Sequence, residues 1–173
     1  MLARVRAGEA AAYAELVTRH APVARRLAVL SGAGSDADDV VQEAFVKAYR
    51  SLSSFRDGAD FRPWLLRIVV NESRNLHRGR SRRSDRELRV VREDARLVTG
   101  SDPADVAVSD ERREALLGAI RTLPEELREV VTCRYLLELS ETETAEALDI
   151  PNGTVKSRLR RGLARLREEL ADV

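Results

Sequence analysis

The stretch SETETAEALDIPNGTVKSRLRRGLARLR, residues 140–167, decides the fold of the C-terminal part of this chain. Ser140 precedes Glu143 by three residues, the spacing of a capping box, which starts a helix by satisfying its free backbone N–H groups. Residues 149–153 contain a proline and a glycine and break that helix. A second helix follows, and its apolar positions recur every three or four residues, so they must face a core. These positions are Val155, Leu159, Leu163 and Leu166.

The second helix carries its polar and basic residues on the face opposite the apolar stripe, while Ala145 and Leu148 give the first helix a narrow apolar face. The outer face of the second helix consists of Lys156, Ser157, Arg160, Arg161 and Arg165. A short helix, a tight turn and a longer helix with a basic outer face make a helix-turn-helix, whose second helix has the right size to enter a DNA major groove. The structural alternative is an ordinary helical hairpin with solvated arginines.

The composition of the 173 residues predicts an all-α protein. Aromatic residues make up 4% and charged residues 34%, glycine and proline are few, and no segment alternates as a strand does. The sequence has no apolar run of about 18 residues and no signal-peptide core, so we expect no membrane insertion and a cytoplasmic location. The single Cys133 excludes an internal disulfide and is expected to be buried.

The formal net charge is only +1, but the charges are unevenly distributed along the chain. Six basic residues and no acidic one lie in residues 156–167, and five arginines against the single Glu72 lie in residues 71–83. Acidic residues gather in residues 36–43 and again in residues 138–149. Two separated basic faces and two acidic ones indicate two sites for the DNA backbone and further surfaces for protein partners.

Three or four helices are expected in the N-terminal half of the chain. Residues 9–30 form the first, which Pro22 should kink or divide. Ser35 is the expected N-cap of the second, which runs to about Leu52. Its buried stripe consists of Val40, Phe45 or Ala44, Ala48 and Leu52. The third helix begins at Phe61 and ends in a basic tail, and its apolar stripe consists of Phe61, Trp64, Leu65, Ile68, Val69 and Leu76.

Residues 84–109 are polar, lack aromatic residues and are expected to be a flexible linker with room for a short helix. After it, Leu116, Leu117, Ile120 and Leu123 indicate one helix. Pro124 suits the first turn of the next helix, whose expected apolar positions are Leu127, Val130, Val131, Tyr135 and Leu136. The sequence therefore predicts two small helical domains, residues 1–83 and 110–173, the second containing the helix-turn-helix.

Two long blocks resemble the extracytoplasmic-function (ECF) bacterial sigma factors, and together they cover most of the chain. Residues 34–55 (GSDADDVVQEAFVKAYRSLSSF) and 61–75 (FRPWLLRIVVNESRN) resemble region 2 of that family. Residues 123–131 (LPEELREVV) and 139–161 (LSETETAEALDIPNGTVKSRLRR) resemble region 4. The resemblance implies a transcription-initiation subunit without enzymatic activity or cofactor. Such a subunit binds core RNA polymerase and directs it to promoter DNA.

The resemblance also implies which residues meet which partner. In this family one helix of region 2 docks on the β′ clamp of the polymerase, which the factor contacts together with the β subunit. The residues that match that helix are Asp38, Asp39, Gln42, Glu43 and Val46. This acidic, partly apolar face avoids the buried stripe, as a surface for a protein partner should. The alternative is a solvated helix face.

Region 2 of the family also reads and melts the downstream (−10) promoter element. The residues that match this reader are Phe55, from the loop of residues 53–60, with Asn71, Arg74, Asn75 and Arg78. An extruded base needs hydrogen bonds to its edge and a cover for its face, and asparagine and an aromatic ring supply these two. Trp64 is expected in the core instead.

Region 4 reads the upstream (−35) element through the second helix of its helix-turn-helix. Lys156, Ser157, Arg160 and Arg161 match the residues that read base edges in the major groove. Thr154 and Arg158 are expected to contact phosphate, which positions the helix without reading sequence. For any single arginine, a phosphate contact or a solvated position is the alternative.

The sequence departs from the family pattern at two sites of the motif. Thr144 stands where the family usually has isoleucine, and Asn152 stands where valine is common. Thr144 either loosens the packing between the two helices or forms a hydrogen bond within it. The end of the chain soon after Leu170 resembles the minimal two-domain members, and the family further implies an anti-sigma factor as a partner.

Three rival interpretations remain. A stand-alone helix-turn-helix regulator accounts for residues 140–167 but leaves the two region 2 blocks unexplained. A decoy for an anti-sigma factor would keep the fold and lose the basic residues, yet Arg74, Arg78, Lys156 and Arg160 are present. An enzyme would need a metal cluster, a phosphate loop or a nucleophile arrangement, which the sequence does not offer, and both histidines are expected to be surface residues.

Overall fold

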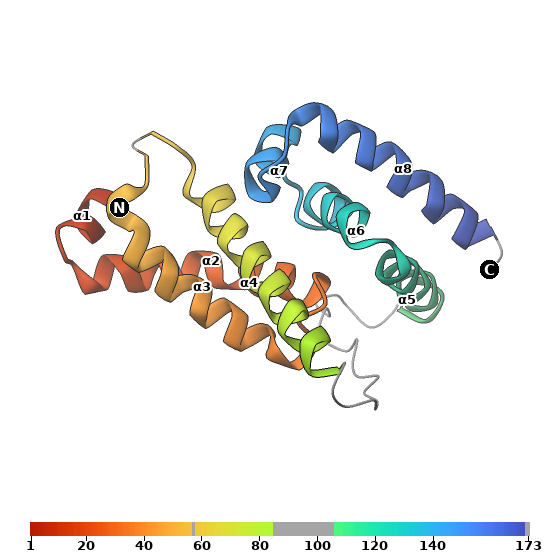
Figure 1. Ribbon diagram of the computed structural model, residues 1–173, viewed down its shortest axis with the longest axis horizontal. Coiled ribbons are helices and arrows are strands. Elements are labelled where there is room, and N and C mark those ends of the chain that lie inside the picture. Colours follow the sequence, from red (N-terminus) through yellow and green to blue (C-terminus); the bar gives the residue numbers. More distant parts are fainter. Residues whose placement is uncertain (57, 85–105, 172–173) are drawn as a thin grey trace. The chain divides into compact units, whose positions relative to one another are not determined.

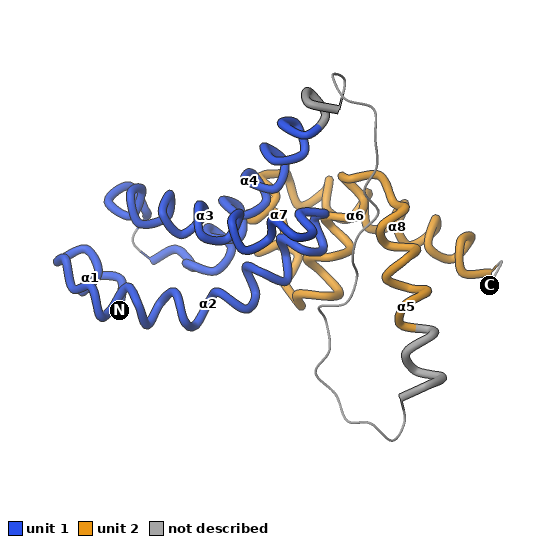
Figure 2. Tube along the Cα trace, turned by 90° about the horizontal axis from the view of Figure 1, so that it is seen from below, with its two compact units in different colours: residues 1–93 blue, residues 94–173 orange. Residues whose placement is uncertain are grey.

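The computed structural model describes residues 1–56, 58–84 and 106–171, and the regular secondary structure within them is entirely helical (Figure 1). The chain divides into two compact units, Met1–Glu93 and Asp94–Val173 (Figure 2). The predicted all-α class with two helical units is therefore confirmed.

Unit 1 contains four α-helices within the described residues: α1 (Leu2–Arg6), α2 (Ala10–Leu30), α3 (Ala37–Ser51) and α4 (Phe61–Ser84). Helices α2, α3 and α4 pack against one another, and α1 packs on α2. The core of the unit combines leucines and valines with fully buried alanines such as Ala24, Ala28 and Ala44. Because alanine adds little bulk, it lets neighbouring helices approach closely. The structure thereby holds α3 and α4, which carry the predicted interaction residues, in one packed layer.

The predicted stripe of α3 is confirmed, since Val40, Ala44, Phe45, Ala48 and Leu52 are all buried. The buried stripe of α4 differs from the predicted one, because Trp64, Ile68 and Leu76 are only half-buried. Phe61, Leu65 and Val69 are buried as expected, and Leu66 and Val70, which the pattern did not single out, are fully buried as well. The reason is that α4 packs against both α2 and α3, so two neighbouring faces of one helix are covered.

Two predictions concern the helix boundaries of unit 1. Pro22 was expected to kink or divide its helix, and it does not divide it, because α2 continues from Ala10 to Leu30 with Leu16 and Leu27 buried on either side of the proline. Ser35 is not an N-cap: it lies in a 3-10 turn, Gly34–Asp36, and α3 begins at Ala37 without a side-chain cap hydrogen bond. The chain enters α3 already coiled, so the helix has little need of a capping hydroxyl.

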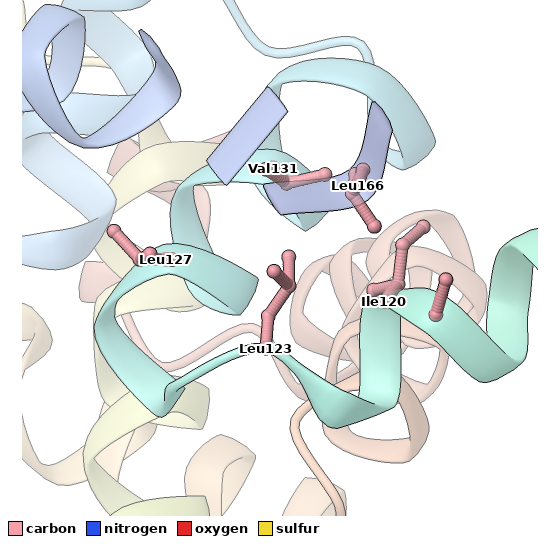
Figure 3. Close-up of a cluster of buried hydrophobic side chains, with 6 residues drawn as sticks. Ile120, Leu123, Leu127, Val131 and Leu166 are labelled. Carbon is pink, nitrogen blue, oxygen red and sulfur yellow. The ribbon is translucent and has the colours of Figure 1, made fainter. Parts of the chain in front are cut away.

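Unit 2 contains α5 (Val106–Thr122), α6 (Glu125–Val131), a π-helical turn (Thr132–Leu136), α7 (Glu141–Leu148) and α8 (Asn152–Ala171). Helix α5 therefore begins inside the segment expected as a linker, and residues 85–105 of that segment lie outside the described residues. Helix α8 contacts α5, α6 and α7. A buried cluster draws its side chains from α5, α6 and α8 and from the short connection between α5 and α6 (Figure 3). Its members are Ala119, Ile120, Leu123, Leu127, Val131 and Leu166.

The π-helical turn contains two residues that were predicted to be buried, and the prediction is wrong for the first and confirmed for the second. Tyr135 was expected to be apolar core, but it is 55% exposed. A π-helical turn holds more residues per turn than an α-helix, so it rotates the following side chains off the face that α6 would have buried. Cys133, earlier in the same turn, is fully buried as predicted.

Both histidines were expected on the surface, and both are instead half-buried. His20 packs its ring against Phe61, and burial lowers the pKa of its imidazole, with the charges of Arg19 and Arg62 adding to the effect. His77 lies 2.8 Å from the carbonyl oxygen of Ser31 through its Nε2 atom. Neither position was visible from periodicity, because the partner belongs to another element in each case.

Within the described ranges, no helix combines the length and apolarity that crossing a bilayer requires.

Candidate nucleic-acid and partner interfaces

The face of α3 opposite its buried stripe carries all five residues predicted to dock on a protein partner. Asp38, Asp39, Gln42, Glu43 and Val46 are all exposed. Asp38 also accepts a hydrogen bond from Arg25 of α2, at 2.7 Å. The structure brings the predicted set together on one helix face, which combines three carboxylates with an exposed apolar side chain.

An apolar groove runs beside this face, between α2 and α3, and it was not predicted from the sequence. The groove has a volume of about 700 Å³, and its lining includes Tyr13, Val17, Phe45, Val46 and Tyr49. The rings of Tyr13 and Tyr49 meet edge to face, with centroids 4.9 Å apart. Burial raises the pKa of Tyr13 to about 12, and its hydroxyl donates to the carbonyl of Phe45, so it stays protonated at neutral pH. The sequence signal for this groove was Tyr49, an aromatic residue that lies outside the predicted buried stripe of its helix. In the structure Tyr49 is 53% exposed.

The C-terminal half of α4 presents the asparagines and arginines of the predicted downstream-element reader. Asn71, Asn75 and Arg78 are exposed, and Arg74 is half-buried. Asn75 accepts a hydrogen bond from Arg78 at 2.6 Å and donates one to Glu72 at 3.3 Å. The expected face is therefore formed, and it contains a short chain of polar contacts that residue spacing alone did not indicate.

Phe55 does not lie where it was predicted. It was expected in an exposed loop as a cover for an extruded base, but only 5% of it is exposed. Its ring packs against Trp64 at 4.8 Å and Phe61 at 6.0 Å between ring centroids. The cause is that α4 brings two aromatic residues under the loop, and burying a third ring among them is more favourable than exposing it.

Arg6 holds the start of this loop and was not predicted to have any role. Its guanidinium donates to the carbonyl of Leu52, at 3.2 Å, and to the carbonyl of Phe55. Short helix α1 thus fixes the backbone on either side of Ser53 and Ser54. No local pattern marks such a contact, because Arg6 and Leu52 lie 46 residues apart in the sequence.

The helix-turn-helix begins with the predicted capping box. Ser140 accepts a hydrogen bond from the backbone N–H of Glu143, at 3.1 Å, and the Glu143 carboxylate accepts one from the Ser140 N–H, at 2.7 Å. Helix α7 ends at Asp149 in the left-handed conformation, with φ 57°. The backbone N–H of Ile150 then donates to the carbonyl of Ala145 at 3.0 Å, which closes the turn before α8. Helix α8 starts at Asn152, earlier than the expected break through Gly153.

The buried face of the helix-turn-helix agrees with the predicted stripe at most positions. Val155 and Leu166 are buried, and Leu159 and Leu163 are partly buried against the same cluster. On α7, Leu148 is buried as expected, whereas Ala145 is half-buried and its place in the core is taken by Ala147 and Thr144. The two helices are therefore packed through a face that leaves the basic side of α8 outward.

The six residues predicted to contact the upstream element lie on that outward side of α8. Lys156, Ser157, Arg160 and Arg161 are exposed, and Thr154 and Arg158 are half-buried. Glu126 of α6 lies 3.3 Å from Arg158 and 3.6 Å from Arg161, and Glu141 of α7 lies 3.5 Å from Lys156. The pairs to Arg161 and Lys156 are exposed and therefore weak, so they leave the basic face available.

The fold and these surfaces define a helical protein of the DNA-binding class, with a helix-turn-helix in one unit and an exposed acidic helix face in the other. Residues 16–83 match the family described as Sigma-70 region 2, and residues 113–166 match Sigma-70, region 4. The ECF RNA polymerase sigma-E factor of Escherichia coli (strain K12) is 37% identical over 165 residues, which cover 92% of this chain and 86% of that protein. Its counterpart from Haemophilus influenzae is 36% identical over 166 residues, which cover 92% of this chain and 87% of that protein.

Two solved structures share the fold. CnrH, determined in complex with the cytosolic domain of CnrY, has a TM-score of 0.74 and 26% identity, covering 99% of this chain and 95% of CnrH. The sigma factor RpoE of Bartonella quintana, determined with the anti-sigma factor NepR, has a TM-score of 0.75 and 24% identity, covering 92% of this chain and 96% of that one.

This chain belongs to the ECF RNA polymerase sigma factors. It is a transcription-initiation factor that directs RNA polymerase to promoters, and its family acts by binding and not by an enzymatic reaction.

Proposed function

We propose that three helix faces have separate roles in transcription initiation. The face of α3 binds core RNA polymerase, the C-terminal half of α4 reads the −10 element, and α8 reads the −35 element. One observation carries this assignment. Each of the three helices buries its apolar stripe in its own unit and leaves the assigned polar side chains outside the core, apart from the half-buried Arg74, Thr154 and Arg158. The faces therefore keep their functional groups without any cost to the packing of the fold.

The polymerase surface consists of the acidic face of α3 together with the groove beside it. Asp39 and Glu43 would meet basic side chains of the β′ clamp, and Val46 and Tyr49 would bury apolar surface against it. A surface with apolar anchors inside a charged rim has the anatomy of a specific protein interface. Contacts to the β subunit belong to the same proposal.

For the −10 element, Asn71 and Asn75 would hydrogen-bond base edges, and Arg74 and Arg78 would hold phosphate or a base. Phe55 is not assigned a direct contact with DNA, because its ring is buried against Trp64. Asp57, within that loop, lies outside the described residues.

For the −35 element, α8 would enter the major groove with Lys156, Ser157, Arg160 and Arg161 against base edges and Thr154 and Arg158 toward phosphate. Arg158 is only 20% exposed and forms an ion pair with Glu126. A side chain held in this way is better suited to a phosphate contact that positions the helix than to a contact with a base.

The proposal includes the domain organisation, with residues 1–83 as the region 2 domain, residues 84–109 as the linker and residues 110–173 as the region 4 domain. It also includes the absence of catalytic activity. A cytoplasmic location follows from family membership, because promoter DNA and RNA polymerase are found there in bacteria.

An anti-sigma factor is the proposed regulatory partner. The proposal is supported by CnrH, which was determined in complex with a second protein, and by the exposed apolar groove between α2 and α3. A partner that covers this groove would compete with the polymerase for Val46 and Tyr49. Affinity purification of the tagged chain from its source cells, without recovery of any such inhibitor, would count against it.

The direct test is transcription in vitro with purified core polymerase and a library of duplex promoters, with and without this chain. We expect transcripts that depend on the protein and start at defined sites, and the library promoters that yield them share the two promoter elements. DNA binding without any transcript would favour the stand-alone regulator instead.

Charge reversal tests the polymerase face separately. The double variant Asp39→Lys, Glu43→Lys should bind core polymerase at least about tenfold more weakly, because like charges would face each other across the interface. Glu15→Lys, which reverses an exposed charge on α2, is the matched control and should bind as the wild type does. Unchanged co-elution of the double variant with core polymerase would reject the docking assignment.

A further inference from the structure

Glu72 occupies a position between the proposed polymerase helix and the proposed DNA-reading face, and both of its carboxylate oxygens are engaged. Its side chain is 13% exposed. Oε2 accepts a hydrogen bond from Nζ of Lys47 on α3, at 2.7 Å, and Oε1 accepts one from Nδ2 of Asn75, at 3.3 Å. Lys47 also lies 3.5 Å from Glu43. The carboxylate is therefore held in one orientation by groups on two helices.

The contacts continue along α4 through spacings of three residues. Asn75 accepts a hydrogen bond at Oδ1 from Nη2 of Arg78, at 2.6 Å. Residues 72, 75 and 78 share a face, since positions three apart are neighbours on a helix. Glu43, Lys47, Glu72, Asn75 and Arg78 thus form a continuous polar chain from the outer face of α3 to that of α4.

The chain determines which way the amide of Asn75 points. An ionised carboxylate only accepts hydrogen bonds, and a guanidinium only donates them. The amide nitrogen must therefore face Glu72 and the amide oxygen must face Arg78. The opposite orientation would place oxygen against oxygen and N–H against N–H, so the network itself resolves the usual ambiguity between the two amide positions.

We propose that Glu72 is a positioning residue for recognition of the −10 element, one that fixes the amide of Asn75 and, through it, the guanidinium of Arg78. This inference rests on the proposed function of the α4 face. With Glu72 in place, the second hydrogen of the Asn75 amide and the remaining N–H groups of Arg78 are presented as donors. Such a pair suits a base edge rich in acceptors, such as N7 and O6 of guanine.

Lys47 ties the positioning group, the carboxylate of Glu72, to α3. The hydrogen bond to Glu72 and the charges of Glu72 and Glu43 raise the pKa of Lys47, so its ammonium remains charged across the physiological range. Because Lys47 is 42% exposed, its ion pair adds little to the stability of the fold. The network therefore contributes mainly to the orientation of Asn75 and Arg78 and only little to the stability of the fold.

The variant Glu72→Gln tests the proposal at constant shape. Lys47 can only donate, so the glutamine oxygen would face Lys47 and the glutamine nitrogen would face Asn75. The Asn75 amide would then either turn round or lose its contact with residue 72, and its orientation would no longer be fixed. In transcription from the promoter library, we expect discrimination at one position of the −10 element to fall about tenfold. Preference at the other −10 positions, at the −35 element and for core polymerase should match the control Glu15→Gln, which removes one exposed carboxylate of the same unit.

Three outcomes are separable. Wild-type preference in the −10 element that survives Glu72→Gln unchanged overturns the role of Glu72 and leaves the proposed function intact. A uniform loss at all −10 positions, or weaker polymerase binding, assigns Glu72 to folding or docking and also overturns it. Transcripts from wild-type protein that carry no −10 preference reject the α4 assignment and the inference with it.

A spectroscopic measurement on the free full-length protein examines the network without promoter or polymerase. Glu72→Gln should shift the side-chain ¹⁵N–¹H amide cross-peaks of Asn75, whereas Glu15→Gln should leave them in place. Identical Asn75 cross-peaks in wild type and Glu72→Gln would show that Glu72 does not hold the amide in solution, and the inference would be overturned on that ground alone.

Discussion

Thr144 of α7 is fully buried, and its hydroxyl has no hydrogen-bond partner within the described residues. The sequence left two outcomes open for this residue, and the hydrogen bond is not formed. A buried hydroxyl without a partner costs about 1–3 kcal/mol relative to a satisfied one. The residue therefore weakens the motif at the site where an apolar side chain would pack equally well.

At the scale of this residue, Thr144→Val is predicted to stabilise the chain. Valine keeps the branched shape and removes the hydroxyl, so we expect the free energy of unfolding to rise by about 1 kcal/mol. Urea unfolding followed by circular dichroism measures the change. Thr142→Val, on the exposed side of the same helix, is the control and should give no such gain. A Thr144→Val variant less stable than wild type would mean that its hydroxyl is satisfied in solution.

At the scale of elements, the contact between α6 and α8 depends on Gly162. A β-carbon at this position would lie 2.9 Å from Cγ2 of Val131 and 3.7 Å from Leu127. Val131 is 2% exposed and β-branched, so its methyl groups have little freedom to move away. The glycine thus sets how closely α8 approaches the core of unit 2.

Gly162→Ala is accordingly predicted to destabilise unit 2 by about 1 kcal/mol, because overpacking outweighs the gain in helix propensity. Gly118→Ala is the matched control: it lies inside α5 with nothing within 4 Å of the added carbon. This control should gain up to about 1 kcal/mol from helix propensity. Thermal unfolding of both variants distinguishes the two effects, and equal gains in stability would show that Val131 yields to the new methyl group.

At the scale of the whole molecule, a net charge of +1 gives little overall attraction to DNA, so binding depends on how the charges are distributed. The basic residues of α8 face outward, and the acidic residues of α3 belong to the other unit. A protein of this kind is attracted to DNA through one face and to a basic protein surface through another. Salt should weaken both interactions because exposed charges are screened.

Arg160→Ala is predicted to weaken binding to a duplex with the −35 element by about 1–3 kcal/mol and to relax specificity at one position. Fluorescence anisotropy over a range of salt concentrations compares this duplex with a scrambled one. Arg165→Ala, on the same helix but outside the proposed readers, should weaken both duplexes alike and reduce the salt slope by about 1. Equal losses for Arg160→Ala on the two duplexes would reject base reading by Arg160.

Much of the candidate site was predictable because it is built on single helices. The spacing of the buried stripe in α3 is enough to place Asp39 and Glu43 on the opposite side, and the stripe of α8 does the same for Lys156 and Arg160. A helix repeats every 3.6 residues whatever surrounds it, so one buried face defines the exposed one. The prediction for Phe55 depended on a neighbouring element and fared worse, and the one for Tyr135 failed because a π-helical turn interrupts the α-helical repeat.

The sequence by itself determined the helical class, the capping box at Ser140, the outward face of α8 and membership of the sigma-factor family. These features depend on residues a few positions apart or on long motifs that local order preserves. Only the tertiary structure decided that the ring of Phe55 is buried against Trp64 and that Arg6 binds the backbone carbonyl of Phe55. It also decided that Glu72 of α4 pairs with Lys47 of α3. The physical reason is that such contacts join residues 25 or more positions apart, or a loop to a helix, and they form only when the helices pack.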